Sequence, residues 1–503
     1  MRLENSIKNI KTAWVLQLVH ILCQFFSRTV IIKALTIEYV GLSGLFSNVL
    51  TMLSLAELGI GEAIIFSLYK PIAEDDHKII NSIMGFYKKI YIGVGLFILV
   101  AGLAITPFID VFIKEMPDIP EIYTIYMLYV INSSVSYFFS YKSAFVTATQ
   151  KNYLVVVNKG IWEVLMVVLQ VTVLFATKNY IAYMVIGIVF VVIQNISITT
   201  IANKKYPYLK EKSGEKIPPY IFRQIGKNTG AMVFHKIGYI MVFATDNLIL
   251  SKFIGLVSVG IYANYCTITN AVTVFINKFF NAITASIGNL AVEESVEVQE
   301  KILFRVFFMN FWLYVFSCCC LFNLMNPFIR DIWIGEDFLF GEGIVLLIVL
   351  KIYFSGMRGA AQTFKNAKGL YWYNKYMPIY ESLINLVASV ILCKYIGVAG
   401  VILGTIISSV FTCVWIEPHV LYKYGFNKSA KRFYAKYILY FVIFVIIMAV
   451  TYGINRLLPD AGFVAFVIRC IVTFVVPNIM MILFFNKTDE YKYLYGIIKK
   501  RIR

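Results

Sequence analysis

The chain has 503 residues, of which 59% are hydrophobic and 15% are charged, and its formal net charge is +18. A soluble protein of this length cannot bury so much apolar surface, so the composition excludes an ordinary globular protein. The positive charge is typical of nucleic-acid-binding proteins, but here the basic residues lie in the connections between apolar stretches. The composition therefore predicts a membrane protein, with membrane lipids and no nucleic acid among its partners.

Apolar stretches long enough to cross a bilayer recur along the whole chain. A membrane-spanning helix needs roughly 20 mostly apolar residues, and by that measure the sequence has about fourteen spans. Their centres lie near residues 23, 54, 97, 133, 165, 190, 240, 271, 314, 353, 384, 408, 443 and 473. Hydrocarbon offers no water to backbone groups, so each span is expected to be a helix. The predicted fold class is an all-α polytopic membrane protein.

The first span contains a pattern that returns near the middle of the chain. Residues 26–41 and 245–260 share a polar residue, an apolar run, a lysine, a short turn and a Val-Gly pair, and the two Val-Gly pairs are 219 residues apart. A repeat of this length predicts two equivalent lobes of six helices, followed by two C-terminal helices. Transporters built in this way place their substrate site between the repeats and expose it alternately.

The repeat divides the sequence into five predicted parts. They are an N-lobe at 1–205 with spans one to six, a cytoplasmic linker at 206–226, a C-lobe at 227–424 with spans seven to twelve, an extra helix pair at 425–486, and a basic cytoplasmic tail at 487–503. Residues 204–227 carry seven basic and two acidic residues, and residues 423–436 carry five basic residues and no acidic one. Because basic connections stay in the cytoplasm, both termini are predicted to be cytoplasmic.

Three predicted spans carry polar side chains along a single helix face. In span one they are Gln17, His20, Gln24 and Arg28; in span seven they are His235, Tyr239 and Asp246, with Lys236 and Asn247 beside them; in span ten they are Lys351, Ser355, Arg358, Gln362 and Lys365. A charge near the middle of a bilayer costs roughly 2.5–3.5 kcal/mol on insertion scales, so each one calls for a purpose. The stripes predict the walls of a wet cavity. Snorkelling, or a hydrogen-bonded seam between helices, is the alternative.

These stripes and span eight supply the candidate site residues. The residues expected to bind substrate are Arg28, Arg358, Lys236, Gln24, His20, Lys278 and Asn247, and those expected to couple ions or balance charge are Asp246 and His235. Arginine and lysine bind phosphate oxygens, so a basic cavity suits an anionic substrate, and hydroxyl and amide groups suit a sugar chain. Asp246 has an alternative role, which is to pair with Lys252.

Other sequence features concern catalysis, metal binding and nucleotide binding. Lys159, Glu163 and Glu381 are predicted to form an internal salt link without a substrate role. The eight cysteines lie in or beside apolar spans without metal-ligand spacing, and no G-x-x-x-x-G-K-[ST] loop for nucleotide phosphates occurs. We therefore expect no catalytic residue, no metal site and no cofactor, and no transport driven by ATP on this chain.

One motif in span two resembles a known family. The motif is Leu55-Ala56-Glu57-Leu58-Gly59-Ile60-Gly61-Glu62-Ala63-Ile64, followed by Tyr69-Lys70-Pro71. It is similar to bacterial polysaccharide-biosynthesis membrane proteins, the Wzx-type lipid-linked oligosaccharide flippases of the multidrug/oligosaccharidyl-lipid/polysaccharide exporter superfamily. The chain length, the spans, the paired lobes and the cytoplasmic termini also fit that family. Gly59 and Gly61 are expected to let span two bend or pack closely.

The resemblance implies a transporter, not an enzyme, in the bacterial cytoplasmic (inner) membrane. It implies that the chain flips an undecaprenyl-diphosphate-linked oligosaccharide repeat unit from the inner to the outer leaflet, for capsule, O-antigen or exopolysaccharide assembly. Alternating access would occur around a basic central cavity, to which Arg28 corresponds by its position in the first span. The expected partners are the lipid-linked oligosaccharide, a polysaccharide polymerase and glycosyltransferases.

Two other functions are compatible with a chain of many spans. A drug/cation antiporter of the same superfamily would need acidic side chains in its cavity, and the basic excess argues against it. A multi-span polymerase or glycosyltransferase would need a large external loop with catalytic carboxylates, and the first external connection around Glu38 is too short for one. Coupling to protons, sodium or the membrane potential stays open, since His20, His235 and Asp246 can titrate.

Single cysteines in a cysteine-free variant test the predicted orientation. Ser213→Cys lies in the first basic connection, so it should resist an impermeant thiol reagent added outside the cell, whereas Asp337→Cys should react. The measurement is labelling of intact against permeabilised cells. External labelling at position 213, or protection at position 337, would reverse the orientation.

Overall fold

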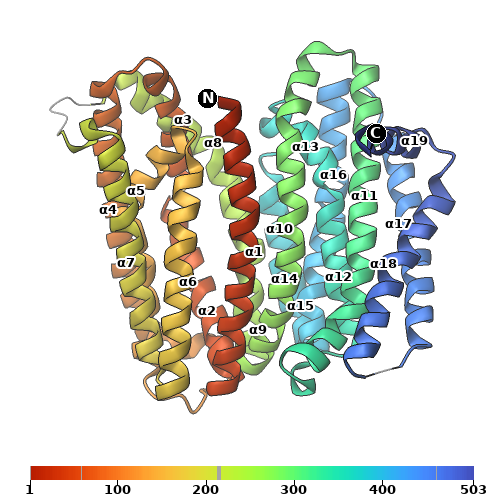
Figure 1. Ribbon diagram of the computed structural model, residues 1–503, viewed down its shortest axis with the longest axis horizontal. Coiled ribbons are helices and arrows are strands. Elements are labelled where there is room, and N and C mark those ends of the chain that lie inside the picture. Colours follow the sequence, from red (N-terminus) through yellow and green to blue (C-terminus); the bar gives the residue numbers. More distant parts are fainter. Residues whose placement is uncertain (1, 58, 212–216, 460, 503) are drawn as a thin grey trace. The chain divides into compact units, whose positions relative to one another are not determined.

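The computed structural model describes residues 2–57, 59–211, 217–459 and 461–502, and the regular secondary structure of these residues is helical (Figure 1). Contacts divide the chain into unit 1, Met1–Gly260, and unit 2, Ile261–Arg503. This boundary comes from contacts and not from the repeat, so the five-part division stays a prediction. The helices of unit 1 are α1 (Arg2–Ala34), α2 (Ile37–Leu53), α3 (Ile60–Ala73), α4 (His77–Ile105), α5 (Ile122–Ala148), α6 (Asn152–Thr177), α7 (Tyr180–Lys205), α8 (Pro219–Phe243) and α9 (Thr245–Phe253).

Helix α10 (Leu256–Glu293) begins in unit 1 and continues into unit 2. The other helices of unit 2 are α11 (Val296–Pro327), α12 (Glu342–Met357), α13 (Gly359–Ala367), α14 (Met377–Ile396), α15 (Val398–Phe411), α16 (Cys413–Val420), α17 (Lys431–Arg456), α18 (Phe463–Phe485) and α19 (Asp489–Ile502). Two membrane spans of this unit, Glu342–Ala367 and Val398–Phe426, consist of shorter helices in succession.

Twelve helical segments of the described chain are long and apolar enough to cross a membrane, and they coincide with twelve of the predicted spans. The other two predicted spans, near residues 133 and 240, fall on α5 and α8, which are not among the twelve. Helix α5 contains many serines, and it packs against α4, α6 and α7, so its sequence does not have to suit lipid. The all-α polytopic fold class is confirmed, and the count of fourteen spans stays a prediction.

Large apolar side chains remain exposed along the spans. On α17 and α18, for example, Val442, Val450, Phe474 and Leu483 are 40–67% exposed to the surroundings. Soluble monomers rarely expose contiguous apolar faces of this size, whereas lipid-facing helices require them. The chain is therefore a multi-pass membrane protein.

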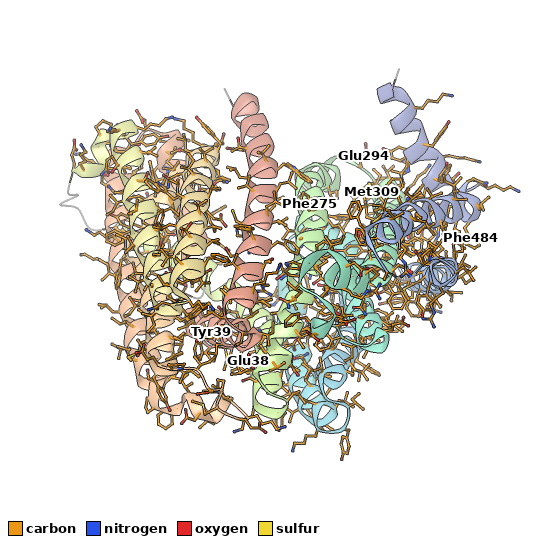
Figure 2. The ribbon with its side chains drawn as sticks, turned by 60° about the horizontal axis from the view of Figure 1, so that its bottom comes forward. Glu38, Tyr39, Phe275, Glu294, Met309 and Phe484 are labelled. Atoms are coloured by element: carbon orange, nitrogen blue, oxygen red, sulfur yellow. The ribbon has the colours of Figure 1, made fainter. Side chains whose placement is uncertain are left out.

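The repeated pattern forms the same helix–turn–helix corner twice. Helix α1 ends at Ala34 and α2 begins at Ile37, and helix α9 ends at Phe253 and α10 begins at Leu256. Both boundaries keep the 219-residue offset of the Val-Gly pairs. The first corner carries Glu38, and Figure 2 labels this residue and Tyr39, which follows it.

The two corners contact each other through their glycines, and the contact lies within unit 1. A Cβ at Gly41 would overlap the carbonyl oxygen of Leu256, and a Cβ at Gly260 would lie 2.6 Å from the carbonyl oxygen of Ile37. Ile37 and Leu256 are themselves repeat partners, so the contact is reciprocal, as in an interface with two-fold symmetry. The absence of a side chain lets the two helices approach this closely.

Span two is broken where the family motif predicted a bend. After α2 the chain forms a 3-10 turn at Ser54–Glu57, and Gly59 takes a left-handed conformation with φ of 77° before α3 begins. A side chain at Gly61 would meet the Tyr91 hydroxyl, which donates a 2.6 Å hydrogen bond to Glu57. The break therefore combines a conformational role for one glycine with a packing role for the other.

Each unit has its own apolar core. In unit 1, α3, α4, α5 and α8 pack together, and their buried residues include Ile64, Leu68, Ile83, Phe145 and Ile225. In unit 2, α11 packs against α12, α17 and α18. Its aromatic residues stack on those of α17: the ring centroids of Phe311 and Tyr440 are 4.3 Å apart, and those of Phe307 and Phe433 are 4.5 Å apart.

The contact between the two corners predicts that a side chain at either glycine lowers the stability of the protein. Gly41→Ala and Gly260→Ala should each destabilise the protein, by about 1–3 kcal/mol, because the added methyl group forces the two corners apart. The measurement is thermal unfolding of the purified protein in detergent. Gly93→Ala in α4 is the matched control, since a Cβ there would meet nothing within 4 Å. Equal melting temperatures for all three variants would contradict the prediction.

Candidate functional site

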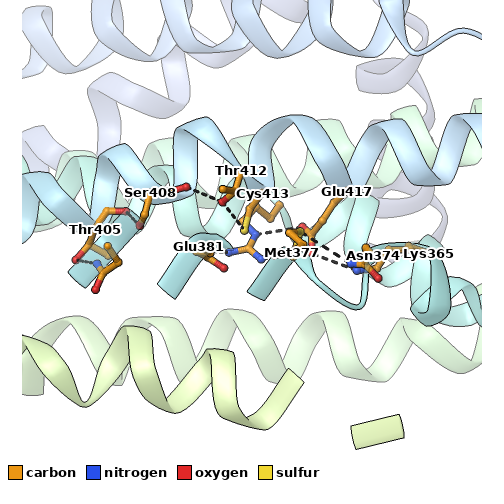
Figure 3. A network of polar contacts seen from close by, with 11 residues as sticks. Lys365, Asn374, Met377, Glu381, Thr405, Ser408, Thr412, Cys413 and Glu417 are labelled. Atoms are coloured by element: carbon orange, nitrogen blue, oxygen red, sulfur yellow. Dashed lines mark hydrogen bonds and ion pairs between the residues drawn. The ribbon is translucent and has the colours of Figure 1, made fainter. Parts of the chain in front are cut away.

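Four charged side chains meet inside unit 2 (Figure 3). The Nε of Arg358 lies 3.1 Å from Oε2 of Glu417, and its Nη1 lies 3.2 Å from Oε1 of Glu381. The Nζ of Lys365 lies 3.2 Å from Oε1 of Glu417. The side chains of Lys365 and Glu417 are only 3% and 1% exposed. We call these four residues the ion cluster.

Interrupted helices bring the ion cluster together. Span ten breaks at Arg358, which separates α12 from α13, and Lys365 follows two turns later on α13. Span twelve breaks at Thr412, which separates α15 from α16, and Glu417 follows on α16. Glu381 lies in the first turns of α14. Discontinuous helices of this kind form binding sites in many transporters, because they turn polar groups toward the protein interior.

The ion cluster contains two cations and two anions. A buried ion pair is tolerated only when its geometry is good and the remaining hydrogen-bonding groups are satisfied. Arg358 meets this condition with three nitrogens, since its Nη2 also lies 3.4 Å from Oε1 of Glu417. In this structure, the guanidinium of Arg358 is therefore already bound to carboxylates. On the sequence pattern alone, this guanidinium is assigned to the substrate. Its substrate role stays a prediction, and an anion would have to compete with Glu381 and Glu417.

A row of hydroxyl groups continues the polar contacts along span twelve. Asn385 on α14 donates to the Thr405 hydroxyl over 3.0 Å. The Ser408 hydroxyl donates to the Thr405 carbonyl over 2.9 Å, and the Thr412 hydroxyl donates to the Ser408 carbonyl over 2.6 Å. Figure 3 shows this row reaching Cys413, beside the ion cluster. The row and the ion cluster thus form one continuous polar centre in unit 2.

In unit 1, the polar stripe of α1 pairs with α6. The Nδ1 of His20 contacts Oε1 of Glu163, and the Nε2 of His20 lies 2.9 Å from Nε2 of Gln24. The sequence placed Glu163 in one salt link with Lys159 and Glu381. Instead, Glu163 pairs with His20, and Glu381 belongs to the ion cluster.

Arg28 lies one helical turn beyond Gln24 on α1. It interacts electrostatically with Tyr129 of α5 and Tyr183 of α7. The hydroxyl oxygens of Tyr129 and Tyr180 are 2.9 Å apart, and the rings of Tyr180 and Tyr183 stack with centroids 5.4 Å apart. We call Arg28 and these three tyrosines the arginine–tyrosine cluster. It presents a cation together with hydroxyl groups and aromatic faces.

The other predicted site residues have separate surroundings. The Nδ2 of Asn247 donates to the carbonyl oxygen of Gly44 over 3.5 Å, and Asp246 is buried at the start of α9. Lys278 is partly buried in α10. The side chains of His235 and Lys236 lie outside the described residues. The substrate and coupling roles of all these residues stay predictions.

Sequence reasoning missed Glu417 and the tyrosines around Arg28. The sequence does contain a signal for Glu417, which is a single carboxylate at the end of an apolar span. Burial of this carboxylate would require a basic partner. Tyr129 and Tyr183 had no such signal, because they come from α5 and α7, which are far from α1 in the sequence. A polar stripe identifies its own helix face but not the residues opposite it.

The sequence matches no protein-family model and no curated protein. Solved structures do match it over most of its length. Lipid II flippase MurJ in an inward closed conformation has a TM-score of 0.67 and 15% identity, and the match covers 95% of this chain and 99% of that one. The chain has the fold of this flippase.

Multidrug transporters share the same fold. An inward-facing multidrug resistance MATE family transporter of the MOP superfamily has a TM-score of 0.62 and 13% identity, covering 78% of this chain and 93% of that one. A mutant of the Vibrio cholerae MATE transporter VcmN has a TM-score of 0.60 and 10% identity, covering 85% of this chain and 98% of that one. At these identities the likeness establishes the fold and leaves the substrate open.

Because the four charges of the ion cluster neutralise one another, we expect that removing one of them destabilises the others. Glu417→Gln leaves Arg358 and Lys365 without their shared anion, so it should destabilise the protein by about 3–5 kcal/mol. Adding Lys365→Met should recover part of that loss, because one cation and one anion then remain. Thermal unfolding of the purified variants measures both effects.

Glu297→Gln provides the control for this experiment. Glu297 also pairs with a lysine, Lys428, over 3.4 Å, but its side chain is 74% exposed, so its loss should change stability little. If Glu417→Gln and Glu297→Gln unfold at the same temperature, the ion cluster contributes nothing beyond a surface pair.

Proposed function

We propose that this chain is a transporter of the MOP superfamily that flips an undecaprenyl-diphosphate-linked oligosaccharide from the inner to the outer leaflet of the bacterial cytoplasmic membrane. The transported unit would serve polysaccharide assembly, upstream of a polymerase and downstream of glycosyltransferases. Transport would proceed by alternating access between the two repeats and would involve no chemical reaction.

The observation that carries the proposal is the length of the match to MurJ. The MurJ match covers 95% of this chain, whereas the two MATE matches above cover 78% and 85%. The MurJ match therefore extends over about 50 more residues of this chain than the 85% match does, since 10% of 503 is about 50. A match over nearly the whole of both chains supports the flippase over the drug transporters.

The chemistry of the arginine–tyrosine cluster supports the same substrate. A guanidinium binds phosphate oxygens with two parallel hydrogen bonds, which suits a diphosphate. Tyr129 and Tyr183, which are partly buried, add hydroxyl groups and aromatic rings, which suit a sugar. Arg28 lies toward the end of α1, and in this proposal it holds the charged link between lipid and saccharide.

A drug/cation antiporter is the second candidate. The MATE matches favour it, and so do Glu381 and Glu417, which place two carboxylates inside unit 2. In the ion cluster, however, Arg358 and Lys365 balance both carboxylates, so the cluster has no net charge to attract an organic cation. This balance makes the antiporter the weaker candidate.

Substitution of Arg28 tests the proposed function. A charge-assisted hydrogen bond is worth about 1.5–3 kcal/mol, so Arg28→Ala should weaken substrate binding about tenfold to a hundredfold and abolish flipping. Arg28→Lys should keep part of the activity, since the charge remains and the fork is lost. The measurement is transfer of an undecaprenyl-diphosphate-linked saccharide across proteoliposomes, followed with an impermeant lectin.

Lys33→Ala is the matched control, because Lys33 is an exposed basic residue on the same helix. It should flip the saccharide at the wild-type rate. Full activity of Arg28→Ala would refute the diphosphate role. Efflux of a cationic dye by proteoliposomes that fail to move the saccharide would replace the flippase with the antiporter.

A further inference from the structure

A cavity of about 350 Å³ lies at the junction of spans twelve and thirteen in unit 2. It is outside both polar clusters described above, and the proposed transport does not use it. The residues that line it are His419, Tyr422, Lys423, Asn427, Lys428, Ser429 and Ala430. All seven belong to one continuous segment, residues 419–430, which joins α16 to α17. We call this cavity the junction pocket.

The backbone opens the junction pocket by leaving regular helix geometry. After α16 the chain widens into a π-helix at Leu421–Phe426, which the hydrogen bond from Lys428 N to Tyr422 O closes over 3.0 Å. Asn427 then takes a left-handed conformation with φ of 54°, which reverses the chain toward α17. Helix insertions of this kind occur frequently at functional sites.

The lining of the junction pocket is basic. The side chains of His419 and Lys423 are exposed, and Lys428 completes the basic set. Lys428 is held in place by Glu300 at 3.1 Å and Glu297 at 3.4 Å, so it shares its charge with α11. Residues 418–459 contain no acidic residue, and the carboxylates that contact the lining come from α11: Glu297 and Glu300 pair with Lys428, and Glu300 also accepts from the Tyr422 hydroxyl over 3.2 Å. His419 and Lys423 are thus the basic side chains that the pocket offers to an anion.

The aromatic side chains near the junction pocket are typical of the depth of lipid headgroups. Trp415 is 44% exposed and Tyr424 is 45% exposed, and both lie within ten residues of the pocket's centre in the sequence. The Tyr434 hydroxyl donates to the carbonyl oxygen of Trp415 over 2.7 Å. Tryptophan and tyrosine gather at membrane–water interfaces, and this connection is also the one whose basic residues predict a cytoplasmic location. The inner leaflet carries anionic lipids.

We propose that the junction pocket binds the phosphate group of an anionic membrane lipid. His419 and Lys423 hold the phosphate, Ser429 and Asn427 supply further hydrogen bonds, and the acyl chains extend along the exposed apolar faces of the neighbouring spans. The bound lipid ties span twelve, which carries Glu417, to span thirteen. The site is independent of the transported substrate.

Native mass spectrometry of the full-length protein tests this site directly. Phosphatidylglycerol should remain bound at concentrations at which phosphatidylcholine is lost. The double variant His419→Gln, Lys423→Gln should weaken phosphatidylglycerol binding about tenfold to a hundredfold, because it removes the ammonium group of Lys423 and the imidazole of His419. It leaves Lys428 and its two glutamates intact, so the packing of α11 is preserved.

Lys204→Gln, Lys205→Gln is the matched control, since it removes two exposed lysines near another basic connection. It should bind phosphatidylglycerol as the wild type does. An equal loss in both double variants would assign the effect to general surface charge and overturn the proposal. Equal retention of phosphatidylcholine and phosphatidylglycerol by the wild type would overturn it as well.

A competition experiment with inorganic phosphate distinguishes a lipid phosphate from a free phosphate ion as the ligand of the junction pocket. If millimolar phosphate binds to the wild type as tightly as phosphatidylglycerol does, and the junction variant loses both, the pocket holds a free anion and the lipid assignment is wrong. If phosphate neither binds at that concentration nor displaces the lipid, the membrane lipid is the ligand.

Discussion

The pairing of Glu417 with both Arg358 and Lys365 is the interaction on which the polar interior of unit 2 depends. A membrane span surrounded by hydrocarbon cannot leave any of these charges without a partner, because the cost exceeds what a single helix can recover. Spans ten and twelve break at Arg358 and Thr412, and these breaks bring the cations and the carboxylate onto facing turns. The irregular helices of unit 2 thus follow from the requirement to neutralise buried charge.

The two polar clusters meet this requirement in different ways. In the ion cluster, carboxylates neutralise the cations, so little of their charge is available to a ligand. In the arginine–tyrosine cluster, the neighbours that interact with Arg28 include neutral phenols, which can exchange one hydrogen-bond partner for another at small cost. A site that must bind and release an anion benefits from partners of the second kind. This difference supports the proposed substrate role of Arg28 in unit 1.

The repeat connects the fold with the proposed function. Gly41 and Gly260 occupy equivalent positions in the two copies, and each lies against the backbone of the other copy's first helical residue. Such a contact has few side-chain atoms to repack, so two helices can meet closely there without interlocking side chains. Transporters with paired repeats move one repeat against the other, and contacts of this kind suit that motion.

The sequence by itself determined the helical membrane class, the 219-residue repeat, the break at Gly59 and the polar stripes of α1 and of span ten. Each of these is a local property, because hydropathy, a positive φ or a helical period is read from neighbouring residues. The partners were decided by tertiary structure: Glu163 for His20, Glu417 for Arg358 and the tyrosines for Arg28. Periodicity gives the face of a helix, but the opposite face belongs to a segment far along the chain, and only packing brings the two together.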